Sequence, residues 1–191
     1  TYNMPFGLKL HHAMDKSRIV ESFKQMTQRH EILRTVFKIE GSSAHQFVLD
    51  EISVELESST VSSVALAEEY RSFVRPFDLS TGPLFRLKYV ETADQGDYLF
   101  MDFHHIITDG FAQGLLEQEF RKLYEGTAVS DVRYQYRDYS EWLQSEAQQK
   151  ERQRQGEYWQ DVFKGTLPVL ELPYDRPRST QNTSQGGVHS F

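Results

Sequence analysis

The hydrophobic pattern in the middle of the chain constrains the fold more than any other feature of this sequence. Residues 84–90 and 98–105 are rich in apolar and aromatic side chains, and a short polar segment separates them. This pattern predicts two antiparallel strands joined by a turn. Apolar residues then recur at helical spacing from Phe111 to Leu123, which predicts a helix that begins just after Gly110.

The segments on either side predict further strands and helices. Phe6 to Leu10 alternate between apolar and polar residues, as in a half-buried strand. Asp15 precedes a run with one apolar helix face and therefore suits an N-cap. We expect an α/β or α+β domain in which helices pack on a mixed sheet. The remaining predictions are a hairpin over residues 32–49, a short strand at 52–56, a serine-rich loop at 58–63, a helix at 65–74 and a long helix from about Asp138 to Phe163.

Composition excludes several classes of protein and of site. The chain has 191 residues, of which 38% are hydrophobic and 13% aromatic, and these proportions fit one globular domain with a sizeable core. It has no cysteine, which removes disulfides, thiol nucleophiles and cysteine-based metal sites. The formal net charge of -7 argues against a nucleic-acid partner, because no basic stripe offsets it. The seven histidines are therefore the main candidates for chemistry.

Nothing in the sequence predicts a membrane anchor or a secretory signal. No stretch approaches the roughly 20 apolar residues of a membrane span, and the N-terminus lacks a basic region that leads into an apolar one. We therefore expect a cytoplasmic protein. The chain starts without Met and ends in a strand-like stretch at 186–191, so we also expect that it is cut from a longer chain.

Residues 103–110, Phe-His-His-Ile-Ile-Thr-Asp-Gly, stand out because they join the second strand to the helix. Adjacent side chains of a strand point to opposite faces, so His104 and His105 cannot both serve one metal ion or one substrate. His105, at the strand end, is the candidate proton acceptor, since imidazole is suited to proton transfer near neutral pH. Asp109 could be its catalytic partner, the cap of the following helix, or the partner of an arginine. The N–H of Gly110 is a free donor at the helix start, where it could hold an oxyanion.

Taken alone, this segment is also compatible with a packing or surface role, but four stretches together carry a resemblance to a known family. The pattern His-His-x-x-x-Asp-Gly at 104–110 resembles the signature of the condensation domains of non-ribosomal peptide synthetases and of the related chloramphenicol acetyltransferase-like acyltransferases. Residues 29–37 (R-H-E-I-L-R-T-V-F), 136–142 (Y-R-D-Y-S-E-W) and 172–178 (L-P-Y-D-R-P-R) are similar to three other stretches of that family, in the same order. The resemblance implies the N-terminal lobe of such a condensation domain, with the two-layer α/β sandwich of a chloramphenicol acetyltransferase-like lobe.

The resemblance implies a role for each residue of the signature. His105 would deprotonate or orient the α-amino group of an acceptor aminoacyl thioester, which attacks a donor thioester to form a peptide bond. His104 would be structural, and Asp109 would form an ion pair with Arg34 that holds the loop and directs His105. Together with Gly110, these are the candidate site residues. We expect no bound metal and no bound cofactor in this lobe.

The resemblance also implies an incomplete domain. An early and a late stretch of the family have no counterpart here, so residues 1–178 would be the N-terminal lobe and residues 179–191 the start of a crossover toward a second lobe. In the family the active-site tunnel runs between the two lobes, so we expect this lobe alone to have little or no activity. The expected partners are the C-terminal lobe, donor and acceptor carrier domains with substrates on phosphopantetheine arms, and an adjacent adenylation domain. Aromatic residues that a second lobe would cover could also cause self-association.

Other functions share the signature. An epimerization domain or a CoA-dependent acyltransferase of the same superfamily would have the same histidine motif, whereas a heterocyclization domain would have aspartate where His104 and His105 stand. A non-catalytic docking module for carrier domains would keep the motif as a scaffold. Ala112 stands where the family often has serine, which removes a hydroxyl from the rim of the pocket without altering His105.

Overall fold

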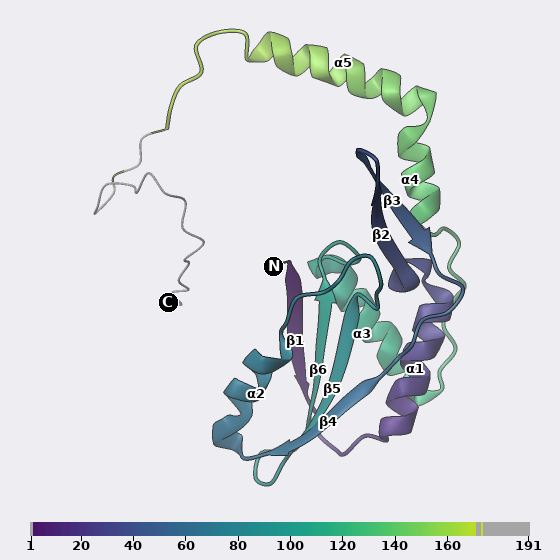
Figure 1. Ribbon diagram of the computed structural model, residues 1–191, viewed down its shortest axis with the longest axis vertical. Coiled ribbons are helices and arrows are strands. Elements are labelled where there is room, and N and C mark those ends of the chain that lie inside the picture. The colour runs from purple at the N-terminus through teal and green to yellow at the C-terminus, as the bar shows by residue number, and fades with distance from the viewer. Residues whose placement is uncertain (1, 171–172, 174–191) are drawn as a thin grey trace. The chain divides into compact units, whose positions relative to one another are not determined.

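The computed structural model describes residues 2–170 and residue 173, and every element below belongs to that part of the chain. The chain divides between Gln144 and Ser145 into two compact units, and the candidate site lies in the first. The elements, in chain order, are β1 (Asn3–Lys9), α1 (Lys16–Arg29), the 3₁₀ helix η1 (Glu31–Arg34), β2 (Thr35–Glu40), β3 (Ser43–Val48), β4 (Leu56–Val61), the 3₁₀ helix η2 (Ser63–Ala65), α2 (Leu66–Phe73), β5 (Phe85–Thr92), β6 (Tyr98–His104), α3 (Gly110–Glu125), α4 (Tyr136–Gln144) and α5 (Glu146–Val162) (Figure 1).

A four-stranded sheet forms the centre of the first unit, with the strand order β1-β6-β5-β4 (Figure 1). β6 lies antiparallel to both β1 and β5, which confirms the antiparallel pair predicted from the two apolar segments. β4 lies parallel to β5, so the sheet is mixed, as expected. β2 and β3 pair separately and confirm the predicted hairpin.

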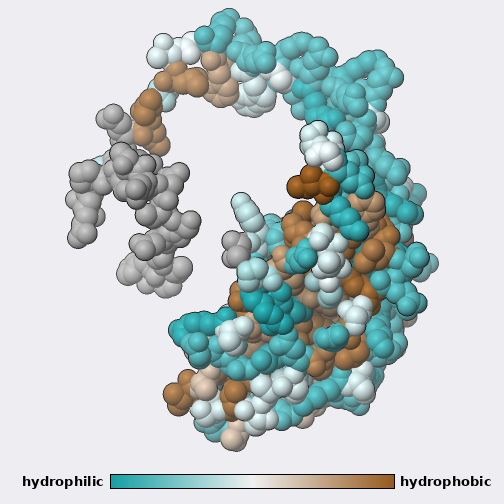
Figure 2. All heavy atoms as spheres, viewed as in Figure 1, coloured by the Kyte–Doolittle hydropathy of each residue, from teal (hydrophilic) through white to brown (hydrophobic). Residues whose placement is uncertain are grey.

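The two faces of the sheet pack against different helices. The larger buried cluster joins β6 to α1 and α3, and in it the rings of Phe23 and Phe120 lie 5.1 Å apart near Phe103. A smaller cluster joins β6 to α2, where Phe73 contacts Phe100 at a ring distance of 5.9 Å. The apolar periodicity of α1 and α3 explains the first cluster, since residues three and four apart share one helix face. In the first unit, Figure 2 shows hydrophilic residues along the outer edge and hydrophobic residues in the middle of the visible face.

Capping residues determine where the helices of this unit begin and end. Asp15 is the N-cap of α1, as predicted, and its carboxylate accepts hydrogen bonds from the N–H groups of Ser17 (2.8 Å) and Arg18 (3.1 Å). The hydrogen bonds from Ser17 and Arg18 hold the pKa of Asp15 below its usual range. Gly126 ends α3 in the left-handed region at a φ of 74°, a conformation that glycine adopts without a steric penalty.

The strand expected at 52–56 and the loop expected at 58–63 are wrong, because β4 spans Leu56–Val61. Its sequence is polar, yet β4 lies at the edge of the sheet, where backbone pairing with β5 supplies the hydrogen bonds and one side remains open. Polar side chains of the strand also find partners on α2: the Ser59 hydroxyl donates to Glu69 Oε1 at 2.6 Å. Tertiary pairing therefore outweighs the low strand propensity of this segment.

The long helix expected from about Asp138 to Phe163 is two helices, α4 and α5. Ser145 separates them with an extended ψ of 151° and serves as the N-cap of α5, since its carbonyl accepts from the N–H of Gln149 at 3.0 Å. Serine favours this position because its hydroxyl can replace the missing hydrogen bonds of the first helical turn. The predictions for Leu172 and for residues 174–178 and 179–191 lie outside the described residues.

Candidate active site

β6 carries the histidine segment to the end of the sheet. His104 is the last residue of the strand, and its N–H donates to the carbonyl of Leu84 at 2.9 Å. His105 follows in a turn, and its N–H donates to the carbonyl of Tyr2 at 2.7 Å. Both backbone positions are therefore fixed by the residues that directly precede β5 and β1. The His105 side chain lies beyond the strand and is exposed.

The ring of His104 is held by aromatic neighbours and by one hydrogen bond. Its centroid lies 6.4 Å from that of Tyr2 and 6.1 Å from that of Phe77. The Nδ1 atom accepts a hydrogen bond from the N–H of Ile106 at 3.0 Å. Because a backbone N–H can only donate, Nδ1 is the unprotonated nitrogen of a neutral ring. Burial lowers the pKa of His104, which also favours the neutral ring.

His105 borders two pockets of the first unit. One, of about 510 Å³, is lined by Tyr2, Leu79, Ile106 and both histidines, and apart from those histidines its lining is largely apolar. The expectation that the two histidines face different sites is therefore wrong, because β6 ends at His104 and His105 lies in the following turn, where strand alternation no longer applies. The other, of about 360 Å³, contains more polar side chains, among them Thr108 and Asp109. An imidazole that borders both pockets can contact groups bound in either of them.

Asp109 and Arg34 do not form the predicted ion pair in this structure. Asp109 is the N-cap of α3, where its Oδ1 accepts from the N–H of Ala112 at 2.7 Å. The Arg34 guanidinium instead donates to the carbonyl of Leu49 and lies 3.7 Å from Glu31. The physical reason is local competition, since Glu31 stands one helical turn before Arg34 and Asp109 is engaged by its own helix. Of the three alternatives left open for Asp109, helix capping is the one present here.

Gly110 is the first residue of α3, and the space beside its Cα is open among the described residues. A Cβ added there would meet nothing within 4 Å, so packing does not explain the glycine. As the first residue of a helix, it has an N–H without an intrahelical acceptor. Its predicted role as an oxyanion donor stays a prediction.

The aromatic residues of α4 lie largely outside the core. Tyr136, Tyr139 and Trp142 are each about half exposed, at 50%, 50% and 52%, instead of packing into the core. Successive rings lie 6.0 Å and 5.7 Å apart, so they contact one another along one side of the helix. Asp138 caps the start of α4, since its Oδ2 accepts from the N–H of Gln135 at 2.8 Å.

Sequence reasoning missed three residues around the histidines. Tyr2 lines the apolar pocket because β1 pairs with β6 in a register that places Asn3 opposite His104. Leu79 reaches the same pocket from a loop, and no local pattern indicates this. Asp102 lies fully buried two residues before His104, and a carboxylate within an apolar strand is a signal that could have found it.

Within residues 2–170 and 173, no group of three or more His, Asp or Glu side chains is arranged to hold a metal ion. None of the helices found in that part of the chain has the length and apolar composition that crossing a bilayer requires.

Solved structures share the fold. The complex of the X-domain and OxyB from teicoplanin biosynthesis contains a chain that matches with a TM-score of 0.80 and 22% identity, over 94% of this chain and 42% of that one. The epimerization domain from the third module of tyrocidine synthetase B matches with a TM-score of 0.78 and 24% identity, over 91% of this chain and 42% of that one. The fold class is therefore the chloramphenicol acetyltransferase-like α/β fold of condensation-type domains, as expected.

The sequence gives the family within that class. The family model of the Condensation domain matches residues 1–191, and the chain belongs to this family. The chain is 39% identical over 191 residues to bacitracin synthase 3 of Bacillus licheniformis and 34% identical over 195 aligned residues to gramicidin S synthase 2 of Aneurinibacillus migulanus. These matches cover 100% of this chain but only 3% and 4% of the relatives, so the chain spans a small part of their length.

Proposed function

We propose that this chain contributes the catalytic histidine of a condensation domain that forms peptide bonds in non-ribosomal peptide synthesis. The observation that supports it most directly is the exposed His105 imidazole, which borders two pockets while backbone hydrogen bonds hold its turn. In the proposed reaction, the amine of an acceptor aminoacyl thioester attacks the carbonyl carbon of a donor thioester. A C–N bond forms, the C–S bond breaks, and the amine proton passes by way of His105 to the leaving thiolate.

The other site residues have supporting roles in this proposal. His104 fixes the turn through its bond to Ile106, and Asp109 caps α3 and so places the helix start beside His105. The N–H of Gly110 donates to the oxyanion that develops on the donor carbonyl. Arg34 stabilises the segment around η1 through Leu49 and Glu31 without reaching Asp109.

The proposed partners follow from the family and remain proposals. Donor and acceptor would arrive on phosphopantetheine arms of carrier domains, with an adenylation domain adjacent in the same protein. Residues 1–178 would form the N-terminal lobe and residues 179–191 the crossover toward a C-terminal lobe. The matched solved chains are more than twice as long as the part that this chain covers, so we expect residues 1–191 alone to catalyse little condensation. The cytoplasmic location and the self-association of the exposed aromatic residues stay predictions.

The decisive experiment replaces His105 in the full-length protein. With donor and acceptor loaded on their carrier domains, His105→Ala should lower the rate of amide formation by about 10²–10⁴-fold, the usual contribution of a general base. His45→Ala is the matched control, because His45 is an exposed histidine of β3 in the hairpin. The product is measured by mass spectrometry at several times.

Two outcomes would contradict the proposal. A rate within about threefold of wild type for His105→Ala would exclude His105 as the base or positioning group. Retained carrier-domain binding with no amide product in the wild-type protein itself would favour the docking alternative, for which the X-domain found in complex with OxyB is a structural parallel.

A further inference from the structure

The face of the sheet that packs against α2 contains a charged pair in which the carboxylate is fully buried and the guanidinium is largely buried. Asp102 lies in β6 with 0% of its surface exposed, and its Oδ2 accepts from Arg86 Nη1 at 2.9 Å and from Asn3 Nδ2 at 2.7 Å. Its second oxygen, Oδ1, is buried and has no hydrogen-bond partner among the residues that the structure describes. A buried ion pair is weak evidence for stability, because desolvation offsets the attraction. The pair is therefore better explained by the neighbouring residues that it holds in place.

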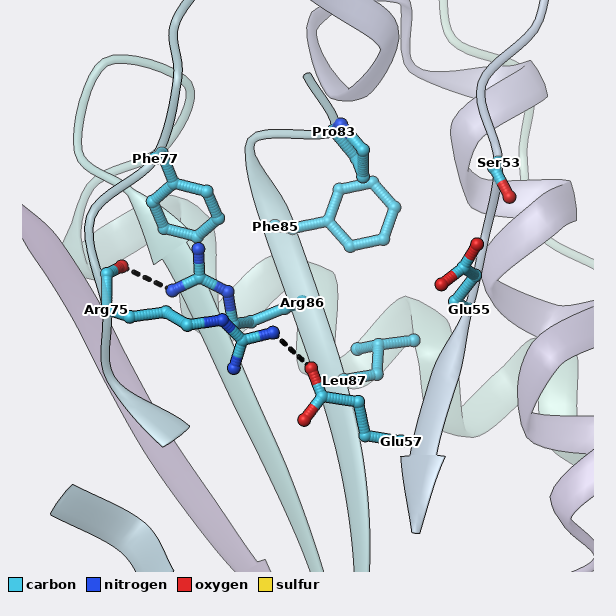
Figure 3. A pocket seen from close by; sticks show the side chains of 9 residues that line it. All are labelled: Ser53, Glu55, Glu57, Arg75, Phe77, Pro83, Phe85, Arg86 and Leu87. Carbon is cyan, nitrogen blue, oxygen red and sulfur yellow. Dashed lines mark hydrogen bonds and ion pairs between the residues drawn. The ribbon is translucent and has the colours of Figure 1, made fainter. Parts of the chain in front are cut away.

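Arg86 joins Asp102 to the segment that precedes the turn at residue 78. Its guanidinium donates to the carbonyl of Arg75 and, at 3.1 Å, to the carbonyl of Pro76. The ring of Phe77 covers the same guanidinium at 3.7 Å from the ring centroid, as the close view shows (Figure 3). Three consecutive residues are thus fixed to the sheet by one planar side chain, which can donate several hydrogen bonds in a fixed geometry.

Phe77 connects this clamp to the candidate active site. Its ring meets the ring of His104 edge to face, with centroids 6.1 Å apart and an interplanar angle of 84°. His104 Nδ1 then accepts the N–H of Ile106, the residue after His105. The contacts therefore run without interruption from Asp102 and Arg86, through Phe77 and His104, to the turn that carries His105.

We propose that Arg86 and Asp102 are positioning residues for His105. They hold Phe77 against His104, so that the His104 ring keeps the orientation in which Nδ1 accepts the Ile106 N–H, and this bond fixes the turn. The inference rests on the proposed function of His105, but its first consequence, the state of the His104 ring, can be measured without any catalysis.

The same face of the sheet offers a matched control pair. Lys88 follows Arg86 by two residues on β5, and its Nζ lies 2.5 Å from Glu69 Oε1 of α2. The Lys88 side chain is 14% exposed, close to the 12% of Arg86. Within the described part of the chain, neither Lys88 nor Glu69 forms a hydrogen bond or ring contact with Phe77 or His104. Lys88 Nζ also lies 3.9 Å from Glu57, which pairs with Arg75, so the control disturbs the same face and its effect on the clamp would pass through Glu57.

The test uses two variants of the clamp. Arg86→Met combined with Asp102→Leu replaces both charges by apolar side chains, so that no buried charge is left without a partner. Arg86→Lys keeps the positive charge beside Asp102 but loses the planar group that covers Phe77 and spans two carbonyls. The control is Lys88→Met combined with Glu69→Leu.

Two quantities are measured for each variant. The first is the ¹⁵N shift of His104 Nδ1 in the ¹⁵N-histidine-labelled 191-residue chain, which reports whether that nitrogen is unprotonated. The second is kcat and KM for amide formation in the full-length protein. For the double variant at Arg86 and Asp102 we expect a Nδ1 signal shifted toward a mixture of tautomers, and a kcat lowered by about 10- to 100-fold at unchanged KM. Arg86→Lys should lie between this variant and wild type, and the control should change neither quantity by more than about twofold.

Each result decides the matter. An unchanged Nδ1 signal and kcat in a folded double variant would overturn the inference, and so would an equal loss in the Lys88 and Glu69 control. If the double variant fails to fold, Arg86→Lys decides, because a folded variant with wild-type kcat and Nδ1 signal overturns the inference as well. If His105→Ala proves fully active while the Nδ1 signal still depends on Arg86, the proposed function fails and the clamp on His104 stands.

Discussion

The two faces of the central sheet stabilise the molecule in different ways. Toward α1 and α3, β6 presents Leu99, Met101 and Phe103 to one continuous apolar cluster. Toward α2, the intervening residues include Phe100 and Asp102, and the apolar cluster gives way to ion pairs as the strand approaches His104. The seven residues of β6 contribute to both faces of the sheet, because successive side chains of a strand point to opposite faces.

The two faces therefore differ in what they contribute: one mainly stabilises the fold, and the other mainly fixes the orientation of side chains. Apolar burial is strong and non-directional, so the face toward α1 and α3 supplies most of the stabilisation without fixing any one side chain of the site. Hydrogen bonds and ion pairs are directional and cost desolvation, so the face toward α2 adds less stability and fixes orientation more narrowly. The candidate active site lies at the end of β6, where residues on the face toward α2 reach the turn that carries His105.

The largest effect should come from the apolar face. Phe103→Ala removes a ring that is 1% exposed and leaves a cavity, so we expect the free energy of unfolding to fall by about 3–5 kcal/mol. Urea denaturation followed by circular dichroism measures this change. The control is Val64→Ala, at a side chain that is 92% exposed, which should change stability by less than about 0.5 kcal/mol. A loss below about 1 kcal/mol for Phe103→Ala would contradict the division between the two faces.

A smaller effect is expected where β6 ends and α3 begins. Asp109→Ala removes the N-cap of α3 and should lower the free energy of unfolding by about 1 kcal/mol. Asp109→Asn should change it by only a few tenths of a kcal/mol, because asparagine caps a helix about as well. Thermal unfolding of the two variants distinguishes capping from the ion pair that the sequence predicted. If Asp109→Ala, Asp109→Asn and Arg34→Gln all lowered the free energy of unfolding by the same amount, the result would support the ion pair between Asp109 and Arg34 instead.

The smallest expected effect is the pH dependence that His104 gives to the free energy of unfolding. Burial lowers the pKa of His104 from its ordinary value of 6.5, with a smaller contribution from His105, while Asp102 acts in the opposite direction. Between the folded pKa and 6.5 the unfolded chain therefore binds more protons than the folded chain. Stability due to His104 is fully present above about pH 6.5 and is lost as the pH falls through this window.

Urea unfolding at several pH values between 7 and 5.5 measures this dependence. His104→Gln should reduce the acid-side loss of stability relative to wild type, and His45→Gln, on the exposed hairpin, should leave the slope as it is. At lower pH the raised pKa of Asp102 acts in the opposite sense, since the folded chain then holds the additional proton. If His104→Gln kept the wild-type slope, the titration of His104 would not be the cause of the pH dependence of stability between pH 7 and 5.5.

Local patterns predicted much of the fold and one part of the site. Helical periodicity and capping chemistry predicted α1 with its cap at Asp15, and two apolar segments separated by a short polar one predicted the antiparallel pair of β5 and β6. These features depend on residues close in sequence. The polar strand β4 and the break at Ser145 escaped prediction, because an edge position and a competing N-cap decided them.

The sequence by itself determined the family and the identity of the candidate histidine, since four stretches in the family's order carry the resemblance and one of them, at 104–110, contains the histidine. Only the tertiary structure decided what surrounds that histidine. Tyr2 reaches it through the register of β1 with β6, Arg34 pairs locally instead of with Asp109, and Arg86 reaches Asp102 across neighbouring strands. The physical reason is that strand alternation is local along the chain, whereas the partners of a buried charge are chosen by whichever strands and loops the fold brings within hydrogen-bond distance.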